Sequence, residues 1–176
     1  MATSHDTSTR GTAGSTGHDD GASVNKSNLC AFWLAGRCLG LDVTLVGEVV
    51  TIQTATPVPM AHQAVRGVFN LRGAPVVVLE LAEILDLTER DETNGKVGLV
   101  LRVGEIVAAA QIDRMEAVIP AGRGTFKPRD PNGDHPAVLG FLDDRDATGK
   151  VVTVLDPLVL IERLQSLRYS SDDAAD

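Results

Sequence analysis

One strand–turn–strand–helix pattern occurs twice in the chain, and this repeat constrains the possible folds more than any other feature. The first copy spans 64–80 and the second spans 137–156. Each copy has a strand, a turn, a very apolar strand and then a carboxylate, Glu80 or Asp156, that opens a helix. A single unit of this size cannot bury a stable core, so we expect two related β subdomains that share an apolar layer. The alternative is that Val-rich strands resemble one another by chance.

Strand patterns fill the sequence around these copies. Only 3% of the residues are aromatic, so the core must consist of aliphatic side chains, and abundant β-branched valine favours strands. The clearest hairpin is 97–112, which turns at Gly104–Glu105 and pairs Val103 with Ile106. This register places three further pairs on the same face, because strand side chains alternate. They are Leu101 with Ala108, Leu99 with Ala110, and Val97 with Ile112.

A second hairpin, with Leu34 opposite Leu39, decides what the two cysteines can do. In that register Cys30 faces Val43, and Cys38 lies in the turn. The two thiols then sit at opposite ends of the hairpin, too far apart for a disulfide. We therefore expect no redox role for either cysteine.

Helices are expected to be short and few. Asp156 is an N-cap acceptor and is followed by Pro157, which together start a helix near the end of the chain. Residues three apart mark the inward face of this helix: Leu158, Ile161, Leu164 and Leu167. Another short helix follows Glu80, and its expected inward residues are Leu81, Ile84 and Leu85. Residues 122–136, rich in proline and charge, are expected to form a loop.

Composition divides the chain into three segments. Residues 1–28 are polar, with almost no large apolar side chain, and are expected to be a disordered tail. Residues 29–169 are the expected folded unit, and 170–176 an acidic, frayed C-terminus. No stretch has the apolar length of a signal peptide or a membrane span, so we expect a cytoplasmic protein without direct membrane insertion. The expected fold is mainly β, with two small five-stranded barrels packed side by side and a groove between them.

Charge and chemistry favour binding over catalysis. The formal net charge is −8, which disfavours nucleic acid as a partner. The histidines are isolated or lie in the tail, and no motif for a metal, a phosphate loop or a serine nucleophile occurs. Asp143, Asp144 and Asp146 cluster on an expected hairpin turn, where acidic side chains commonly accept local backbone hydrogen bonds. We therefore expect no catalytic residue, no metal and no cofactor.

The stretch from Val65 to Gly73 is the most informative part of the chain for function. Asn70 can hold a turn through a local hydrogen bond, and Gly73 permits the positive φ that a bend requires. Leu71 then faces the core, and Arg72 is carried outward on a rigid corner. Taken alone, Arg72 is equally well interpreted as an ordinary surface charge.

Residues 66–73 read Arg-Gly-Val-Phe-Asn-Leu-Arg-Gly and precede a Val-rich strand. This pattern resembles the signature of the CheW family of chemotaxis coupling proteins. Residues 32–42 and 46–49 resemble the first hairpin of the family and its Val-x-Glu-Ile motif, and 138–156 resembles its last strands and final helix. The likeness covers about residues 30 to 165. The chain departs from the family at Glu80, where the family usually has Asp, and the loop 122–136 does not align.

The resemblance implies two SH3-like barrels and a scaffold without enzymatic activity, located at membrane-associated chemoreceptor arrays. It implies two partners: the cytoplasmic tip of chemoreceptors, bound in the groove, and the regulatory domain of a CheA-type histidine kinase. The receptor contacts that it implies are Val46, Glu48, Asn70, Leu71 and Arg72. It assigns no kinase-contact residue.

Two other functions stay open at this point. The same fold could serve a CheA-like kinase that governs pili motility, development or gene expression. A small enzyme or ligand-binding protein on a double barrel is the alternative from another class, and it requires a convergent set of buried titratable groups.

Overall fold

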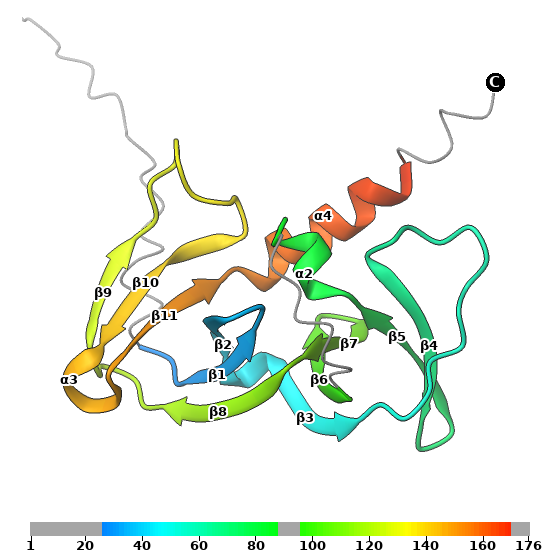
Figure 1. Ribbon diagram of the computed structural model, residues 1–176, viewed down its shortest axis with the longest axis horizontal. Helices are drawn as coiled ribbons and strands as arrows, with labels where there is room; N and C mark the ends of the chain where they lie inside the picture. The colour runs from blue at the N-terminus through cyan, green and yellow to red at the C-terminus, as the bar shows by residue number, and fades with distance from the viewer. Residues whose placement is uncertain (1–25, 88–95, 170–176) are drawn as a thin grey trace, which may run out of the picture.

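The computed structural model describes residues 26–87 and 96–169, and gives only the backbone of 164–169. These ranges form a mainly β protein with a few short helices (Figure 1). The strands are β1 (Leu29–Leu34), β2 (Arg37–Asp42), β3 (Val46–Thr51), β4 (Val65–Leu71), β5 (Ala74–Leu79), β6 (Val97–Val103), β7 (Ile106–Ile112), β8 (Arg114–Ile119), β9 (Thr125–Pro128), β10 (Val138–Asp144) and β11 (Lys150–Leu155). The helices are the 3-10 turn η1 (Val43–Leu45), α2 (Leu81–Ile84), α3 (Arg145–Thr148) and α4 (Pro157–Tyr169).

The expected tails fall mostly outside this description, namely 1–25 and 170–176. Asn28, which we expected in the first tail, makes two contacts with the folded unit. Its carbonyl accepts a hydrogen bond from the Val43 amide, and its Oδ1 accepts one from the Ala121 amide, each at 2.9 Å. Asn28 is therefore hydrogen-bonded to the folded unit.

The strands form two sheets, and each sheet takes strands from both halves of the chain. Sheet A has six strands in the order β8-β1-β2-β11-β10-β9, and sheet B has five in the order β3-β6-β7-β5-β4. After the β1–β2 hairpin the chain crosses to sheet B, where β3 pairs with β6. After the β6–β7 hairpin it crosses back, and β8 pairs with β1. The expected double-barrel fold is confirmed, but one subdomain, β3 to β7, is inserted between β2 and β8 of the other, and β9 adds a sixth strand to sheet A (Figure 1).

The repeat in the sequence is confirmed by matching hydrogen bonds in the two sheets. The amide of Glu80 donates to the Ala64 carbonyl at 2.9 Å, and the amide of Asp156 donates to the Ala137 carbonyl at 2.8 Å. In each copy the second strand pairs in parallel with the second strand of a hairpin, β5 with β7 and β11 with β2. The two copies therefore have the same place in their sheets.

A glycine occupies the same position in both copies because another backbone segment crosses there. A Cβ on Gly67 would lie 2.4 Å from the Thr56 oxygen, and a Cβ on Gly140 would lie 2.3 Å from the Lys127 oxygen. The crossing segment is β9 in sheet A and an isolated bridge between Thr56 and Val68 in sheet B. Only glycine permits this approach, so the repeated glycine has a steric reason.

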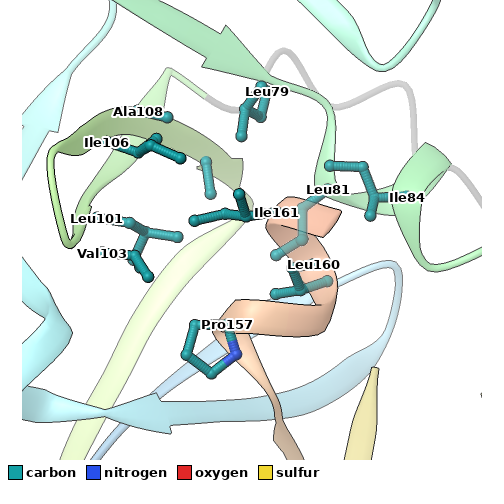
Figure 2. Close-up of a pocket in the computed structure, with 11 residues that line it drawn as sticks. Leu79, Leu81, Ile84, Leu101, Val103, Ile106, Ala108, Pro157, Leu160 and Ile161 are labelled. Carbon is teal, nitrogen blue, oxygen red and sulfur yellow. The ribbon is translucent and has the colours of Figure 1, made fainter. Parts of the chain in front are cut away.

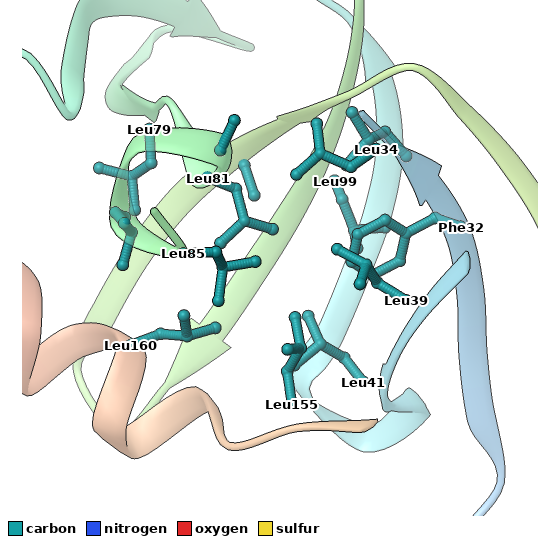
Figure 3. Packing of buried hydrophobic residues seen from close by; sticks show 14 of the residues in the cluster. Phe32, Leu34, Leu39, Leu41, Leu79, Leu81, Leu85, Leu99, Leu155 and Leu160 are labelled. Carbon is teal, nitrogen blue, oxygen red and sulfur yellow. The ribbon is translucent and has the colours of Figure 1, made fainter. Parts of the chain in front are cut away.

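Three hydrophobic clusters form the core. The largest lies between the two sheets, and we call it the shared layer (Figure 3). Its members include Phe32, Leu39, Leu41 and Leu155 from sheet A, Leu79, Leu99 and Leu101 from sheet B, and Leu81, Leu85 and Leu160 from the helical segments. Cluster A packs on the other face of sheet A and contains Leu29, Ala31, Cys38, Ile119, Leu142, Val152 and Val154. Cluster B packs on the other face of sheet B and contains Ile52, Phe69, Val76, Val78, Val100 and Ala109.

One of the two predicted hairpin registers is confirmed and the other is wrong. The β6–β7 hairpin has the predicted register at all four of its inward pairs. In the β1–β2 hairpin Leu34 lies opposite Arg37 rather than Leu39, so the turn consists only of Ala35–Gly36. The two registers differ by two residues and keep the same side chains on each face, so the hydrophobic pattern alone could not separate them.

Both cysteines are buried free thiols, and burial raises the pKa of each. The expected absence of a disulfide is confirmed, but for a different reason. Cys30 lies opposite Leu41 with its side chain in the shared layer, whereas Cys38 lies opposite Trp33 in cluster A. The two thiols are on opposite faces of the sheet, and Val43, the expected partner of Cys30, belongs to η1.

Both predicted helices are present, with one correction to their packing. The expected inward residues of α2 are all buried: Leu81, Ile84 and Leu85. Asp156 starts α4 as expected, since its Oδ1 accepts a hydrogen bond from the Leu158 amide at 2.9 Å. Leu158 itself is 61% exposed, and Leu160 is buried instead, because α4 contributes Leu160 to the shared layer beside α2. The side chains of Leu164 and Leu167 lie outside the description.

The predicted loop at 122–136 contains a strand, so that prediction is wrong in part. Thr125–Pro128 forms β9, which is antiparallel to β10 and places Phe126 opposite Leu142. Phe126 packs against cluster A, and this apolar contact holds the segment in spite of the prolines and glycines around it. Pro128 ends the strand at a sheet edge, where a missing N–H is tolerated.

Candidate functional site

The turn between β4 and β5 forms the corner that was expected to carry Arg72. β4 ends at Leu71 and β5 begins at Ala74, so the two turn residues are Arg72 and Gly73, with φ of +52° and +93°. Asn70 closes the turn as predicted, because its Oδ1 accepts a hydrogen bond from the Gly73 amide at 2.6 Å. Two-residue turns with positive φ match the twist of the flanking strands, so the backbone fixes the direction in which Arg72 leaves the turn.

Arg72 is paired with Glu48 across the open side of sheet B. The Arg72 guanidinium donates to Glu48 Oε2 at 2.7 Å. Glu48 comes from β3 and Arg72 follows β4, which are the two edge strands of sheet B, so this ion pair joins the edges of the curled sheet. The Arg72 side chain is 78% exposed and that of Glu48 is 24% exposed. Surface pairs of this kind contribute at most about 1 kcal/mol to stability, so the pair positions Arg72 more than it stabilises the fold.

The other predicted site residues lie at different distances from this ion pair. Leu71 packs against cluster B beside the turn. Val46 pairs with Leu101 and packs against the shared layer, and a bulge at Gly47 separates it from Glu48. Four of the five predicted residues therefore gather at one place, which we call the Arg72 corner: Glu48, Asn70, Leu71 and Arg72.

Two exposed residues beside the corner were not predicted. Arg102 of β6 lies over Gly47, since a Cβ added to that glycine would be 2.9 Å from Arg102 Nε. Val49, which follows Glu48 in β3 and lies on the opposite face of the strand, is 47% exposed. The register of hairpin 97–112 already turns Arg102 outward, because Leu101 faces inward. Its place beside β3 depends on a long-range strand pairing that no local pattern indicates.

A polar cluster lies on β8 and β1 in sheet A. Glu116 accepts hydrogen bonds from Trp33 Nε1 at 2.5 Å and from Arg114 at 2.7 Å, and it also pairs with Lys150. Arg114 lies over the Trp33 ring, 4.7 Å from its centroid. The hydrogen bonds from Lys150, Trp33 and Arg114 lower the pKa of Glu116 to about 2. A carboxylate held ionised in this way is not a general acid near neutral pH.

The acidic cluster was expected to accept local backbone hydrogen bonds; Asp143 does accept one from the Arg145 amide at 3.3 Å, but most of its partners are side chains. Asp143 pairs with Arg145 at 2.6 Å, and this hydrogen bond lowers the pKa of Asp143 to about 2. Asp144 is buried and accepts hydrogen bonds from Thr148 Oγ1 at 2.8 Å and Arg123 Nε at 3.0 Å. Within 26–87 and 96–169, no group of three His, Cys, Asp or Glu side chains is arranged to hold a metal ion.

The expected groove between the subdomains is largely filled by the shared layer. Beside it, where α4 meets the β6–β7 hairpin, an apolar pocket of about 20 Å³ opens (Figure 2). Its lining includes Leu101, Val103 and Ile106 from the hairpin, and Leu160 and Ile161 from α4. None of the helices in the described part of the chain is long and apolar enough to cross a membrane.

Comparison with known sequences identifies a family. Residues 29–165 match the sequence model of the CheW-like domain. The chemotaxis protein CheW of Thermotoga maritima is 30% identical over 96 residues, which cover 54% of this chain and 63% of the relative. The chemotaxis protein CheW of Treponema pallidum is 28% identical over 101 residues, which cover 48% of this chain and 59% of the relative. The chain thus spans about 60% of the length of these curated relatives.

Comparison with solved structures gives the same fold. The crystal structure of the scaffolding protein TtCheW from Thermoanaerobacter tengcongensis superposes with a TM-score of 0.65 and 24% sequence identity. The match covers 77% of this chain and 87% of that one. The arrangement of two SH3-like barrels is therefore common to both proteins.

Proposed function

The chain belongs to the family of CheW-like domains, and on that premise we propose that it is a non-enzymatic adaptor in chemotaxis signal transduction. In this role it binds the cytoplasmic tip of a chemoreceptor through the Arg72 corner and the regulatory domain of a CheA-type histidine kinase through a different surface. It acts on the cytoplasmic side of membrane-associated receptor arrays. The observation that carries the proposal is the exposed Arg72, held on a two-residue turn and paired with Glu48 at 2.7 Å.

The chemistry of the corner suits a helical receptor tip. An arginine has five N–H donors, so the exposed Arg72 guanidinium can bind a carboxylate of the partner as well as Glu48. The nearby Arg102, which lies over Gly47, adds a second cation on the same side of the sheet as Glu48. A surface of this kind gives specificity and orientation toward an amphipathic helix with acidic side chains.

The direct test replaces Arg72 by a residue of opposite charge. We expect Arg72→Glu to leave the fold intact, because the ion pair is at the surface, and to weaken binding of a receptor cytoplasmic fragment by about 10-fold or more. Binding is measured by biolayer interferometry, and folding is checked by circular dichroism and thermal unfolding. Wild-type affinity in the variant would exclude Arg72 from the receptor interface.

Two matched variants distinguish a direct contact between Arg72 and the receptor from an effect of losing the internal Arg72–Glu48 ion pair. Arg145→Glu breaks the comparable surface pair with Asp143 in sheet A, where the side chains are 65% and 21% exposed, and should keep full receptor binding. The double variant Glu48→Arg with Arg72→Glu restores an ion pair within the corner but reverses the charge that the receptor meets. We expect it to bind as weakly as Arg72→Glu, and recovery of affinity would show that only the internal pair matters.

A further inference from the structure

We propose that an open cavity at the start of β4 in sheet B binds a small organic anion, a monocarboxylate with a short apolar body. The cavity has a volume of about 470 Å³, which falls in the range of small-molecule sites. It lies at the far end of β4 from the Arg72 corner. Arg66 and Arg72 are six residues apart along an extended chain, or about 20 Å, so the two sites are distinct.

The walls of the cavity are held by backbone contacts. The Ile52 amide donates to the Lys96 carbonyl at 2.6 Å and extends the pairing of β3 with β6. Thr56 and Val68 exchange two backbone hydrogen bonds of 2.8 Å, which fix the segment after β3 against β4. Gly67 permits this close crossing, since a Cβ there would lie 2.4 Å from the Thr56 oxygen. The site is therefore largely formed before any ligand arrives.

The charge of the lining selects an anion. Arg66 and Lys96 both line the cavity, together with the side-chain amides of Gln53 and Gln111, and none of the described lining residues is acidic. Arg66 shares its guanidinium with Glu80 at 3.3 Å while its side chain stays 48% exposed. Among the described residues at the cavity, two cations less one neighbouring carboxylate leave a single positive charge, which a singly charged ligand would balance. This local excess stands out because the whole chain has a formal net charge of −8.

The apolar part of the lining indicates that the ligand also has a short apolar chain. Ile52 is buried and belongs to cluster B, and Ala55 and Pro57 complete an apolar wall. Gln111 is only 9% exposed, so its amide lies deep in the site beside this wall. A carboxylate can therefore meet the cations while a short aliphatic chain covers the apolar wall.

Comparison of the two repeats shows that Arg66 differs in character from Leu139, the residue at the equivalent position of the other copy. Arg66 and Leu139 are the extra residues of equivalent β-bulges, and a bulge redirects the side chain that it carries. Leu139 packs against cluster A, whereas Arg66 lines the cavity of sheet B. The equivalent β-bulge thus carries an apolar side chain that packs on the core in one subdomain, and a guanidinium that lines the cavity in the other.

The test is a titration of the full chain with pentanoate, followed by two-dimensional ¹H–¹⁵N NMR. We expect saturable shifts confined to the segments around Ile52, Arg66, Lys96 and Gln111, with a Kd on the order of 1 mM for so small a ligand. Pentanamide and pentylammonium have the same apolar body without the negative charge, and each should bind at least about 10-fold more weakly.

Single substitutions then show which side chains of the cavity bind the carboxylate. Arg66→Gln and Lys96→Gln should each weaken pentanoate binding about 10-fold, whereas Arg145→Gln, which removes an exposed cation outside the cavity, should leave it unchanged. If Arg66→Gln lowers the Tm, Lys96→Gln carries the comparison. Shifts scattered over all exposed cations, equal binding of pentanamide, or unchanged affinity in both cavity variants would overturn the proposal. Receptor binding is measured separately, so failure here leaves the adaptor role untouched.

Discussion

At the scale of single residues, Arg72 combines an unfavourable backbone with an exposed charge. Its φ of +52° lies in the left-handed region, which costs a non-glycine residue roughly 1–2 kcal/mol. The surface pair with Glu48 returns at most about 1 kcal/mol, so the arginine does not improve stability at this position. A strained residue whose side chain is presented to solvent is typical of a contact site.

The substitution Arg72→Gly should change the stability of the protein and its receptor binding in opposite directions. We expect Arg72→Gly to raise the free energy of unfolding by about 0.5–1 kcal/mol, because glycine adopts positive φ without strain. The same variant should lose receptor binding as fully as Arg72→Glu. Urea unfolding and interferometry measure the two effects. Met60→Gly is the control, since Met60 also has positive φ and is fully exposed, and it should leave receptor binding unchanged.

Glu116 gives the protein an acid-dependent contribution to stability. Hydrogen bonds from Lys150, Trp33 and Arg114 lower its pKa from 4.5 to about 2, so the unfolded chain binds the proton more tightly. The contribution is therefore complete above pH 4.5 and is lost as the pH falls toward 2. We expect Glu116→Gln to be less stable than wild type at pH 7 and to approach it near pH 2.5 in urea unfolding. A stability difference that stays constant between those pH values would contradict this assignment.

At the scale of elements, sequence patterns predicted a strand pairing correctly where alternation and the turn residues both favour the same register. Hairpin β6–β7 was predicted with its register because alternation and a two-residue turn at Gly104–Glu105 agree. Hairpin β1–β2 was misplaced by two residues, since its turn uses Ala35 at φ +50°, which alanine rarely adopts. β9 was missed because it is a four-residue strand whose only apolar anchor is Phe126, in a segment otherwise rich in proline and glycine.

The glycine beneath β9 tests how that strand is held. We expect Gly140→Ala to destabilise the protein by about 1–3 kcal/mol, because the added Cβ would lie 2.3 Å from the Lys127 oxygen and 2.6 Å from the Phe126 ring. Hydrogen exchange should show the loss first in β9, which is an edge strand. Gly133→Ala is the control, since its nearest contact is an ordinary 3.9 Å, and its unfolding free energy should stay close to wild type. Equal effects of the two substitutions would refute the steric account.

At the scale of the whole molecule, one subdomain is inserted into the other. Sheet B uses the consecutive strands β3 to β7, whereas sheet A is interrupted between β2 and β8, and the shared layer draws large side chains from both sheets. The sequence repeat and the family pattern predicted the double barrel and named Glu48 and Arg72. Sequence alone could not place them at the two edges of one sheet, because that contact depends on long-range pairing of β3 with β6. The Arg72 corner therefore exists only when the strands of sheet B, from β3 to β7, have paired.

The central claim is that the chain couples a receptor to a kinase, and co-sedimentation tests it most directly. Receptor-bearing membranes from the native cell are spun down with the CheA-type kinase, with and without the chain, and the kinase in the pellet is measured. We expect the kinase to sediment with the receptors when the wild-type chain is present, and we expect Arg72→Glu to reduce this recovery by about 10-fold while Arg145→Glu does not. Recovery of the kinase that is the same with the chain, without it and with Arg72→Glu would contradict the adaptor function.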